Sequence, residues 1–216
     1  IFALAIGPSV PEIGGVSFLQ FMAPGLIVMA MMQNSFANTS SSLMISKVQG
    51  NVVDVLMPPL SPGELLIGFS LGGVSRGLTV ALVLSLVVLP FVKLEIYSIL
   101  FLVFHAFCAS MLLSLLGLLT AIWAEKFDQL AAITNFIITP LAFLSGTFYS
   151  IERLPEPLLT ASKFNPFFYL IDGFRYGMIG HADGSLPVGI IVTVGCVIVL
   201  WLITLRILKK GYRLKS

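Results

Sequence analysis

The sequence predicts an all-α, polytopic membrane protein with six transmembrane helices, the first of them present only in part. Two observations carry this prediction. Hydrophobic residues make up 57% of the 216 residues and charged residues only 10%, whereas a soluble domain carries roughly 25% charged residues. The charges also lie between long uncharged stretches, and five of these reach the length of about 20 apolar residues that a helix needs to cross a bilayer. A soluble fold is therefore excluded.

We expect a single membrane domain over 1–216, with spans at 1–7 (the end of a first span), 18–39, 65–90, 96–123, 130–149 and 188–208. Residue 1 lies mid-helix by this pattern, so we expect a segment upstream of it. Pro140 and Gly146 predict a kinked or broken fifth span. Small polar residues at 34–42 predict that the second span packs closely against its neighbours, because such residues let helix backbones approach one another.

The placement of Lys and Arg predicts the orientation in the membrane. With the C-terminus in the cytoplasm, seven of the 12 basic residues lie inside and four outside, and Arg76 lies within a span. The opposite orientation inverts this bias. We therefore expect a cytoplasmic C-terminus, and six spans then place the N-terminus on the same side.

The cytoplasmic loop at 47–66 is apolar where a solvated loop would be polar. Valines surround Asp54, and Pro58-Pro59 ends any helix there. The pattern predicts a short helix near 48–57 that lies in the membrane interface or docks against another protein. Pro62 then suits the first position of the third span.

The outside segment at 150–187 is also unusually apolar. It is rich in aromatic residues but interrupted by Pro166, Asp172 and Arg175. This composition predicts a pair of re-entrant or interfacial helices between spans five and six, which are tolerated at membrane depth only where protein or a water-filled cavity covers their backbone.

Enzymatic motifs are missing from the sequence. His105 and His181 belong to no HExxH pattern, no span holds paired carboxylates, and there is no GxSxG. Cys108 and Cys196 lie in apolar spans without a CxxC, so we expect no metal site and no catalytic residue. Without a GxxxxGKS loop the chain cannot bind ATP in the usual way, so any driving ATP must be bound by another polypeptide.

Arg76 is the one ionisable side chain near the middle of a span, apart from His105. An unpaired Arg there costs at least about 2.5–3.5 kcal/mol, so we expect it to face the bundle interior, a dimer seam or a water-filled path. Either helix carbonyls and the hydroxyls of Ser75 or Ser85 satisfy it, or it attracts anions on a translocation route. All ten acidic residues lie in loops or at span ends, which argues against an ion-coupled transporter.

Two sequence blocks, VVDVLMPPLSPGELLIG at 52–68 and LAFLSGTFYSIERLPEPL…NPFFYLIDGFRYGMIG at 141–180, together with the six spans, resemble ABC type-2 permeases. The resemblance covers essentially the whole chain. It is closest to the YadH/NodJ-like branch of bacterial exporters.

The resemblance implies a homodimer in the bacterial plasma (inner) membrane, with two copies of an ABC ATPase subunit that bind the ATP and Mg; this chain itself then holds no cofactor. It places the coupling helix that docks the ATPase at Gln49, Gly50, Asn51, Val52, Val53, Asp54, Val55 and Leu56. The outside helices would close the export path, with gate residues Tyr149, Asn165, Pro166, Phe167, Tyr169, Asp172, Arg175 and Tyr176. An amphipathic helix is implied before Ile1.

The function expected from these features is that of a permease subunit of an ATP-driven exporter, which moves an amphipathic, lipid-like, saccharide or drug substrate outward. No nucleic-acid partner is expected. The alternatives are a secondary transporter or channel that needs no ATPase, and a membrane protein with a structural or assembly role.

Overall fold

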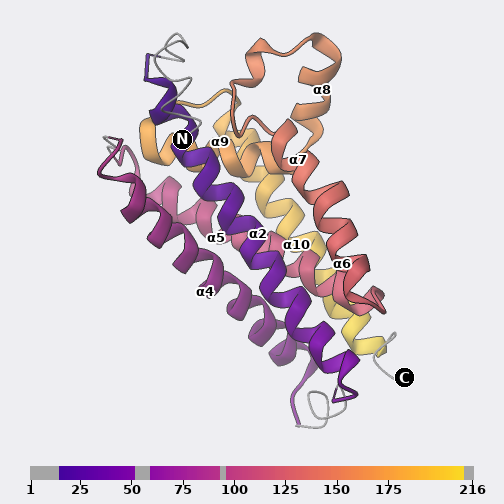
Figure 1. Ribbon diagram of the computed structural model, residues 1–216. Coiled ribbons are helices and arrows are strands. Elements are labelled where there is room, and N and C mark those ends of the chain that lie inside the picture. Colours follow the sequence, from indigo (N-terminus) through magenta and orange to yellow (C-terminus); the bar gives the residue numbers. More distant parts are fainter. Residues whose placement is uncertain (1–14, 52–58, 93–95, 212–216) are drawn as a thin grey trace.

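The computed structural model describes residues 15–51, 59–92 and 96–211, and in these ranges the chain is mainly helical (Figure 1). This confirms the all-α prediction for that part of the chain. The elements are α2 (Phe18–Val48), α4 (Pro62–Val88), α5 (Ile99–Trp123), α6 (Phe127–Ile133), the π-helix η2 (Thr134–Ile138), α7 (Thr139–Leu144), the 3-10 helix η3 (Ile151–Arg153), α8 (Glu156–Phe164), α9 (Pro166–Ile179) and α10 (Leu186–Lys210).

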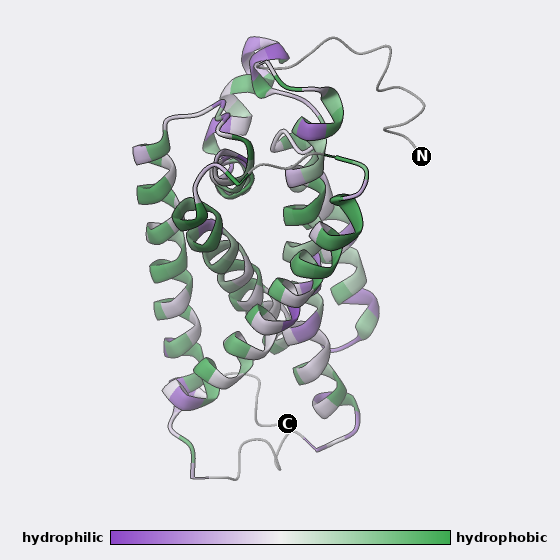
Figure 2. Cartoon of the chain, turned by 90° about the vertical axis from the view of Figure 1, so that its left-hand side faces the viewer, coloured by the Kyte–Doolittle hydropathy of each residue, from purple (hydrophilic) through white to green (hydrophobic). Residues whose placement is uncertain are grey.

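The long helices lie side by side and alternate in direction, so that the connections gather at two ends (Figure 1). One end carries α8 and α9, and we call it the cap end. The other carries the connection from α2 to α4, the turn from α5 to α6 and the end of α10, and we call it the loop end. Apolar residues dominate the long helices between these ends (Figure 2), as expected of helices that cross a bilayer.

Four helical segments within the described ranges are long and apolar enough to span a membrane: α4, α5, the continuous segment Phe127–Leu144, and α10. The 31-residue α2 is long enough but is not among them. It carries the polar residues predicted to mediate packing, and it lies against α4, α5 and α9. The expected first span at 1–7 lies outside the described residues.

Most of the helix ends lie within about five residues of the predicted span ends, but α2 is longer than the span expected there. The prediction ended this helix at residue 39, whereas it continues to Val48. The sequence offers no Gly or Pro between these points, and the chain turns only at Gly50, whose φ of 74° is the left-handed conformation that glycine adopts easily. Pro62 begins α4 as predicted, after a Ser61 cap whose side chain accepts a hydrogen bond from the Glu64 amide.

The predicted close packing of the second span is confirmed. Ser35 and Thr39 of α2 are fully buried, and Thr39 donates a hydrogen bond of 2.9 Å to the Ser114 carbonyl of α5. Gly117 of α5 faces the Phe36 carbonyl of α2 at a distance that leaves no room for a side chain. Small residues thus allow α2 and α5 to touch through their backbones, as in other membrane helix pairs.

The fifth span also departs from a regular α-helix near Pro140, where a kink or a break is predicted, although the helix continues through this point to Leu144. The helix changes from α6 to the π-helix η2 just before Pro140, which lies in the first turn of α7. Proline has no amide hydrogen and its ring clashes with the carbonyl four residues earlier, so an inserted π-turn relieves both problems. The span then ends at Leu144, and Gly146 takes a positive φ of 74°.

Candidate functional site

Asn165 organises the start of the buried cap helix α9. Its side-chain oxygen accepts a hydrogen bond of 3.1 Å from the Phe167 amide, while its amide nitrogen donates to the Leu141 carbonyl and to the Ser145 hydroxyl. Pro166 follows at the first helical position, where its missing amide hydrogen costs nothing. The predicted pair of helices broken near Pro166 is therefore present, and Asn165 links the second of them to α7.

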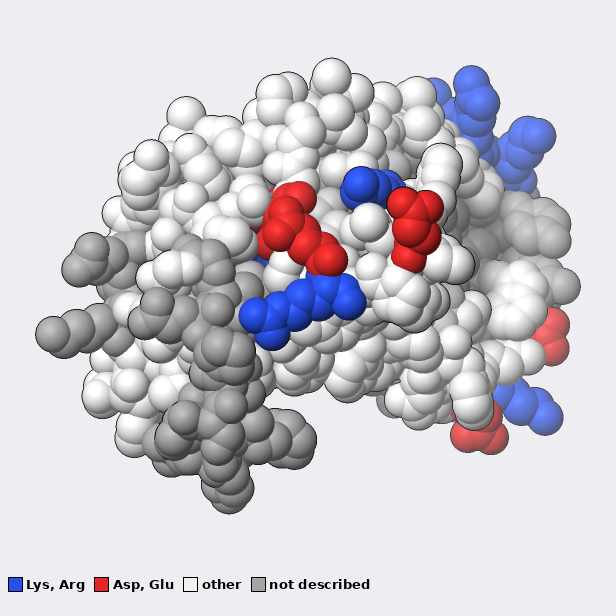
Figure 3. Space-filling view, turned by 90° about the horizontal axis from the view of Figure 1, so that it is seen from above, with Lys and Arg blue, Asp and Glu red and all other residues white. Residues whose placement is uncertain are grey.

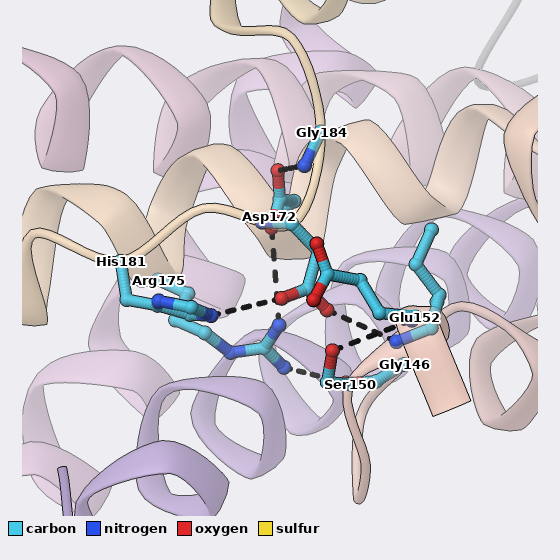
Figure 4. A network of polar contacts seen from close by, with 9 residues as sticks. Gly146, Ser150, Glu152, Asp172, Arg175, His181 and Gly184 are labelled. Carbon is cyan, nitrogen blue, oxygen red and sulfur yellow. Dashed lines mark hydrogen bonds and ion pairs between the residues drawn. The ribbon is translucent and has the colours of Figure 1, made fainter. Parts of the chain in front are cut away.

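Asp172 holds the loop that leads from α9 to α10 (Figure 4). Its carboxylate accepts hydrogen bonds of 2.8 Å from the Asp183 amide and 3.0 Å from the Gly184 amide. Asp183 in turn accepts a bond from the Ile151 amide and contacts the His181 ring. Burial raises the pKa of Asp172, although the amide donors and Arg175 oppose this shift.

Arg175 is completely buried and joins three segments at the cap end. Its guanidinium lies 4.0 Å above the ring of Phe21 in α2 and donates to the Gly146 carbonyl after α7. It also lies 3.9 Å from the Asp172 carboxylate. Burial lowers the pKa of Arg175, and the nearby Asp172 and Asp183 raise it. The cation therefore fastens α9 to α2 and to the end of the fifth span.

The surface of the cap end is mixed in charge. Acidic and basic side chains lie next to one another on a largely uncharged surface when this end is viewed from above (Figure 3). The exposed residues on η3 and α8 include Glu152, Arg153, Glu156 and Lys163. Among its described residues, this end therefore offers no large patch of a single sign to steer a charged partner.

The predicted gate residues take different positions. Asn165 and Phe167 are buried in the core, whereas Tyr149, Pro166, Tyr169 and Tyr176 are half-buried. Tyr176 contacts the rings of Tyr97 and Phe101 edge-on, and Tyr169 contacts Phe168. In the described ranges, no ring contact joins two of the predicted gate residues.

At the loop end, Lys47 caps the last turn of α5. Its ammonium group donates to the carbonyls of Ala121, Ile122 and Ala124 at 3.0, 3.1 and 2.6 Å. The last carbonyls of a helix have no hydrogen-bond partner within the helix. A cation at this end also interacts favourably with the negative end of the helix dipole. From the sequence we expect only a cytoplasmic charge at Lys47, yet in the structure this residue links the end of α2 to the end of α5.

The coupling helix expected at Gln49–Leu56 does not begin where it was predicted. Gln49, Gly50 and Asn51 form the cap of α2 and a turn, because Gly50 has a positive φ. The helical conformation predicted for these three residues is therefore wrong, whereas their predicted role in docking the ATPase subunit stays a prediction. Val52, Val53, Asp54, Val55 and Leu56 lie outside the described residues, so the rest of the expected helix stays a prediction.

Replacing Lys47 with Met is expected to destabilise the purified protein by about 1–2 kcal/mol, because three carbonyls at the end of α5 lose their charged donor. Thermal unfolding in detergent measures this effect. Lys210→Met serves as the control, since Lys210 is exposed at the end of α10. Equal unfolding temperatures for the two variants would contradict the role assigned to Lys47.

Arg76 lies on the outside of the single chain rather than in the bundle interior. Ser75 and Ser85 donate instead to carbonyls of their own helix, those of Gly72 and Ala81. Across the part of the chain that the structure describes, no hydrogen bond or ion pair reaches the Arg76 side chain. Satisfaction of this charge by those serines, one of the two possibilities raised by the sequence, is therefore wrong.

Comparison with known proteins adds to this geometry. Residues 1–179 match the family described as the ABC-2 type transporter. The chain belongs to the ABC-2 type transporter family. It is 35% identical over 216 residues to the inner membrane transport permease YadH of Escherichia coli (strain K12), covering the whole of this chain and 84% of that protein.

More distant relatives carry the name nodulation protein J. The protein from Rhizobium leguminosarum bv. trifolii is 24% identical over 177 residues, which cover 82% of this chain and 68% of the relative. The one from Neorhizobium galegae is 23% identical over 184 residues. The expected membership of the YadH/NodJ-like branch is thus confirmed, and the family implies a membrane transport subunit that associates with an ATPase subunit.

Proposed function

We propose that residues 1–216 form one ABC type-2 transmembrane domain, the permease subunit of an exporter that carries an amphipathic, lipid-like, saccharide or drug substrate outward. Two copies of this chain pair with two copies of a separate ATPase in the bacterial inner membrane. The observation that carries the proposal is the family match over most of the chain, together with 35% identity to an inner membrane transport permease.

In this proposal the loop end faces the cytoplasm and receives the ATPase on the α2–α4 connection. A displacement of this connection moves α2 and α5 together, because hydrogen bonds from Lys47 link the end of α2 to the end of α5. These helices touch through Gly117 and Thr39, so they move as one body. Such tight packing transmits displacement well.

The same two helices carry the motion to the cap end. Helix α9 packs on both α2 and α5, and Arg175 fastens it to Phe21 of α2. A shift of α2 and α5 therefore displaces α9 and the loop that Asp172 holds. This movement opens and closes the outer end of the export path, where Tyr149, Tyr169 and Tyr176 are the proposed aromatic gate.

Asp54→Arg is expected to abolish export while the ATPase subunit retains ATP turnover, because a reversed charge in the docking segment breaks the contact that transmits the push. Reconstituted vesicles measure both activities in one preparation. Glu152→Arg is the matched control, since Glu152 is exposed at the opposite end of the molecule, and it should behave as the wild type. Normal export by Asp54→Arg would count against this docking segment.

A further inference from the structure

Helix α10 ends at the loop end in three basic side chains (Figure 1). Arg206, Lys209 and Lys210 are all exposed, and residues three and four apart lie on one face of a helix. None of the three side chains takes part in a hydrogen bond or ion pair with another described residue. Lys209 and Lys210 interact favourably with the helix dipole in the last turn, whereas Arg206 lies one turn earlier. The three cations therefore form one patch of a single sign, which we call the basic cluster.

The same face of α10 is apolar and exposed from the middle of the helix to the basic cluster. Its outward side chains are aliphatic and recur at helical spacing: Ile191, Ile198, Val199, Leu202 and Ile203. Leu202 precedes Arg206 by four residues, so the apolar face continues directly into the basic cluster. The buried side chains of Thr204 and Leu208 lie on the opposite face. The outward face thus combines a long apolar surface with cations at one end.

A groove of about 360 Å³ lies on this side of the molecule near the middle of α10. Its lining comes from α5, α9 and α10 and includes Leu112, Phe167, Gly195 and Val199. A Cβ on Gly195 would meet nothing within 4 Å, so the missing side chain leaves the surface hollow at this point. The described lining holds no charged side chain, so the groove favours a hydrocarbon chain over a polar group.

The separation between Gly195 and the basic cluster matches the thickness of one lipid leaflet. Gly195 precedes Arg206 by 11 residues, which is about 16 Å along the helix axis at 1.5 Å per residue. Half of the hydrocarbon core of a bilayer measures about 15 Å. When a phospholipid phosphate contacts Arg206, its acyl chain therefore reaches the groove beside Gly195.

From the charge complementarity and this match in length, we propose that the outward face of α10 binds one anionic phospholipid of the bilayer. The lipid phosphate contacts the guanidinium of Arg206, which can bind two of its oxygens, and Lys210 supplies a second cation. One acyl chain follows Leu202 and Val199 to the groove. The basic cluster repels the cation of a zwitterionic headgroup, so this face selects a lipid with net negative charge. The inference adds a lipid partner to the proposed function and does not depend on the transported substrate.

Native mass spectrometry of the full chain in a neutral detergent tests the proposal. The probes are phosphatidylglycerol and phosphatidylcholine with the same acyl chains, added in equal amounts. The wild type is expected to retain phosphatidylglycerol about tenfold more than phosphatidylcholine, because each basic side chain at a membrane surface contributes to the binding of an anionic lipid. The double variant Arg206→Gln, Lys210→Gln should lose most of this preference.

Two further variants separate the headgroup contact from the acyl contact. Arg153→Gln combined with Lys163→Gln removes two exposed cations of the cap end. This control changes the net charge by the same amount and should keep the preference. Gly195→Leu fills the groove at a position where an added Cβ meets no neighbour, and it should lower the retention of both lipids while their ratio stays unchanged.

Three results would overturn the proposal. The first is an unchanged preference in the Arg206→Gln, Lys210→Gln variant; loss of ATPase copurification in that variant would then assign the basic cluster to the ATPase subunit. The second is an equal loss of preference in the cap-end control, and the third is unchanged lipid retention in Gly195→Leu. The lipid titration contains no ATPase, so the absence of an ATPase partner would refute the proposed function and leave this result unaffected.

Discussion

Replacing Arg175 with Met is expected to destabilise the protein by about 3–5 kcal/mol, because removing one member of a buried charge pair leaves the other without compensation. Arg175 is fully buried and lies 3.9 Å from the Asp172 carboxylate. The variant also loses the contact with the Phe21 ring and the hydrogen bond to the Gly146 carbonyl. The temperature at which the detergent-purified protein loses its monodisperse elution peak measures this loss.

Arg175→Lys is expected to recover little of the lost stability. A lysine cannot stack a planar guanidinium on Phe21 while reaching the Gly146 carbonyl. Arg153→Met removes an exposed cation of η3 and serves as the control. If Arg175→Met and Arg153→Met unfold at the same temperature, Arg175 does not fasten the cap end.

Replacing Gly117 with Ala is expected to destabilise the α2–α5 contact by about 1–3 kcal/mol and to reduce export, because the new methyl group overpacks the seam. Its Cβ would lie 2.5 Å from the Phe36 carbonyl oxygen and would also meet the Thr39 hydroxyl. The Phe36 carbonyl belongs to the backbone, and the Thr39 hydroxyl is held in place by its hydrogen bond to the Ser114 carbonyl. Thermal unfolding and export in reconstituted vesicles measure the two effects.

Gly195→Ala is the matched control for this variant. Gly195 lies within α10, and a Cβ there would meet nothing within 4 Å. The alanine should leave stability unchanged or raise it slightly, because Ala favours a helix by about 1 kcal/mol over Gly. If both alanine variants behave alike, the close contact at Gly117 does not limit how α2 and α5 pack.

The sequence predicted the features that depend only on the residues of a single segment. The spacing of charges located α4, α5, α6–α7 and α10, and the prolines located the irregular turn near Pro140 and the interruption of the outside segment at Pro166. These predictions are correct because the length of an apolar stretch and the missing amide hydrogen of a proline affect the same segment in which they occur. Membership of the family followed from two sequence blocks and needed no structure.

The two arginines show what the sequence did not reveal. Of the three positions expected for Arg76, the structure excludes the bundle interior, because the residue is exposed in the single chain. Arg175 was expected to be a gate residue that interrupts an outside segment, and it is fully buried. A span's sequence gives the depth of a residue but not the direction of its side chain, which depends on the neighbours. Likewise, the partners of Arg175 include Phe21 and Gly146, which are far from it along the chain. Nothing in the sequence around Arg175 indicates that these residues contact it.

The central claim is that this chain is the membrane subunit of an exporter driven by a separate ATPase. The most direct test is purification of the full-length protein from its own host in mild detergent, followed by mass spectrometry of the proteins that accompany it. We predict a second polypeptide with a Walker motif in a one-to-one ratio with this chain. A homo-oligomer without an ATPase, found again after crosslinking, would contradict the claim and favour a transporter or channel that works without ATP.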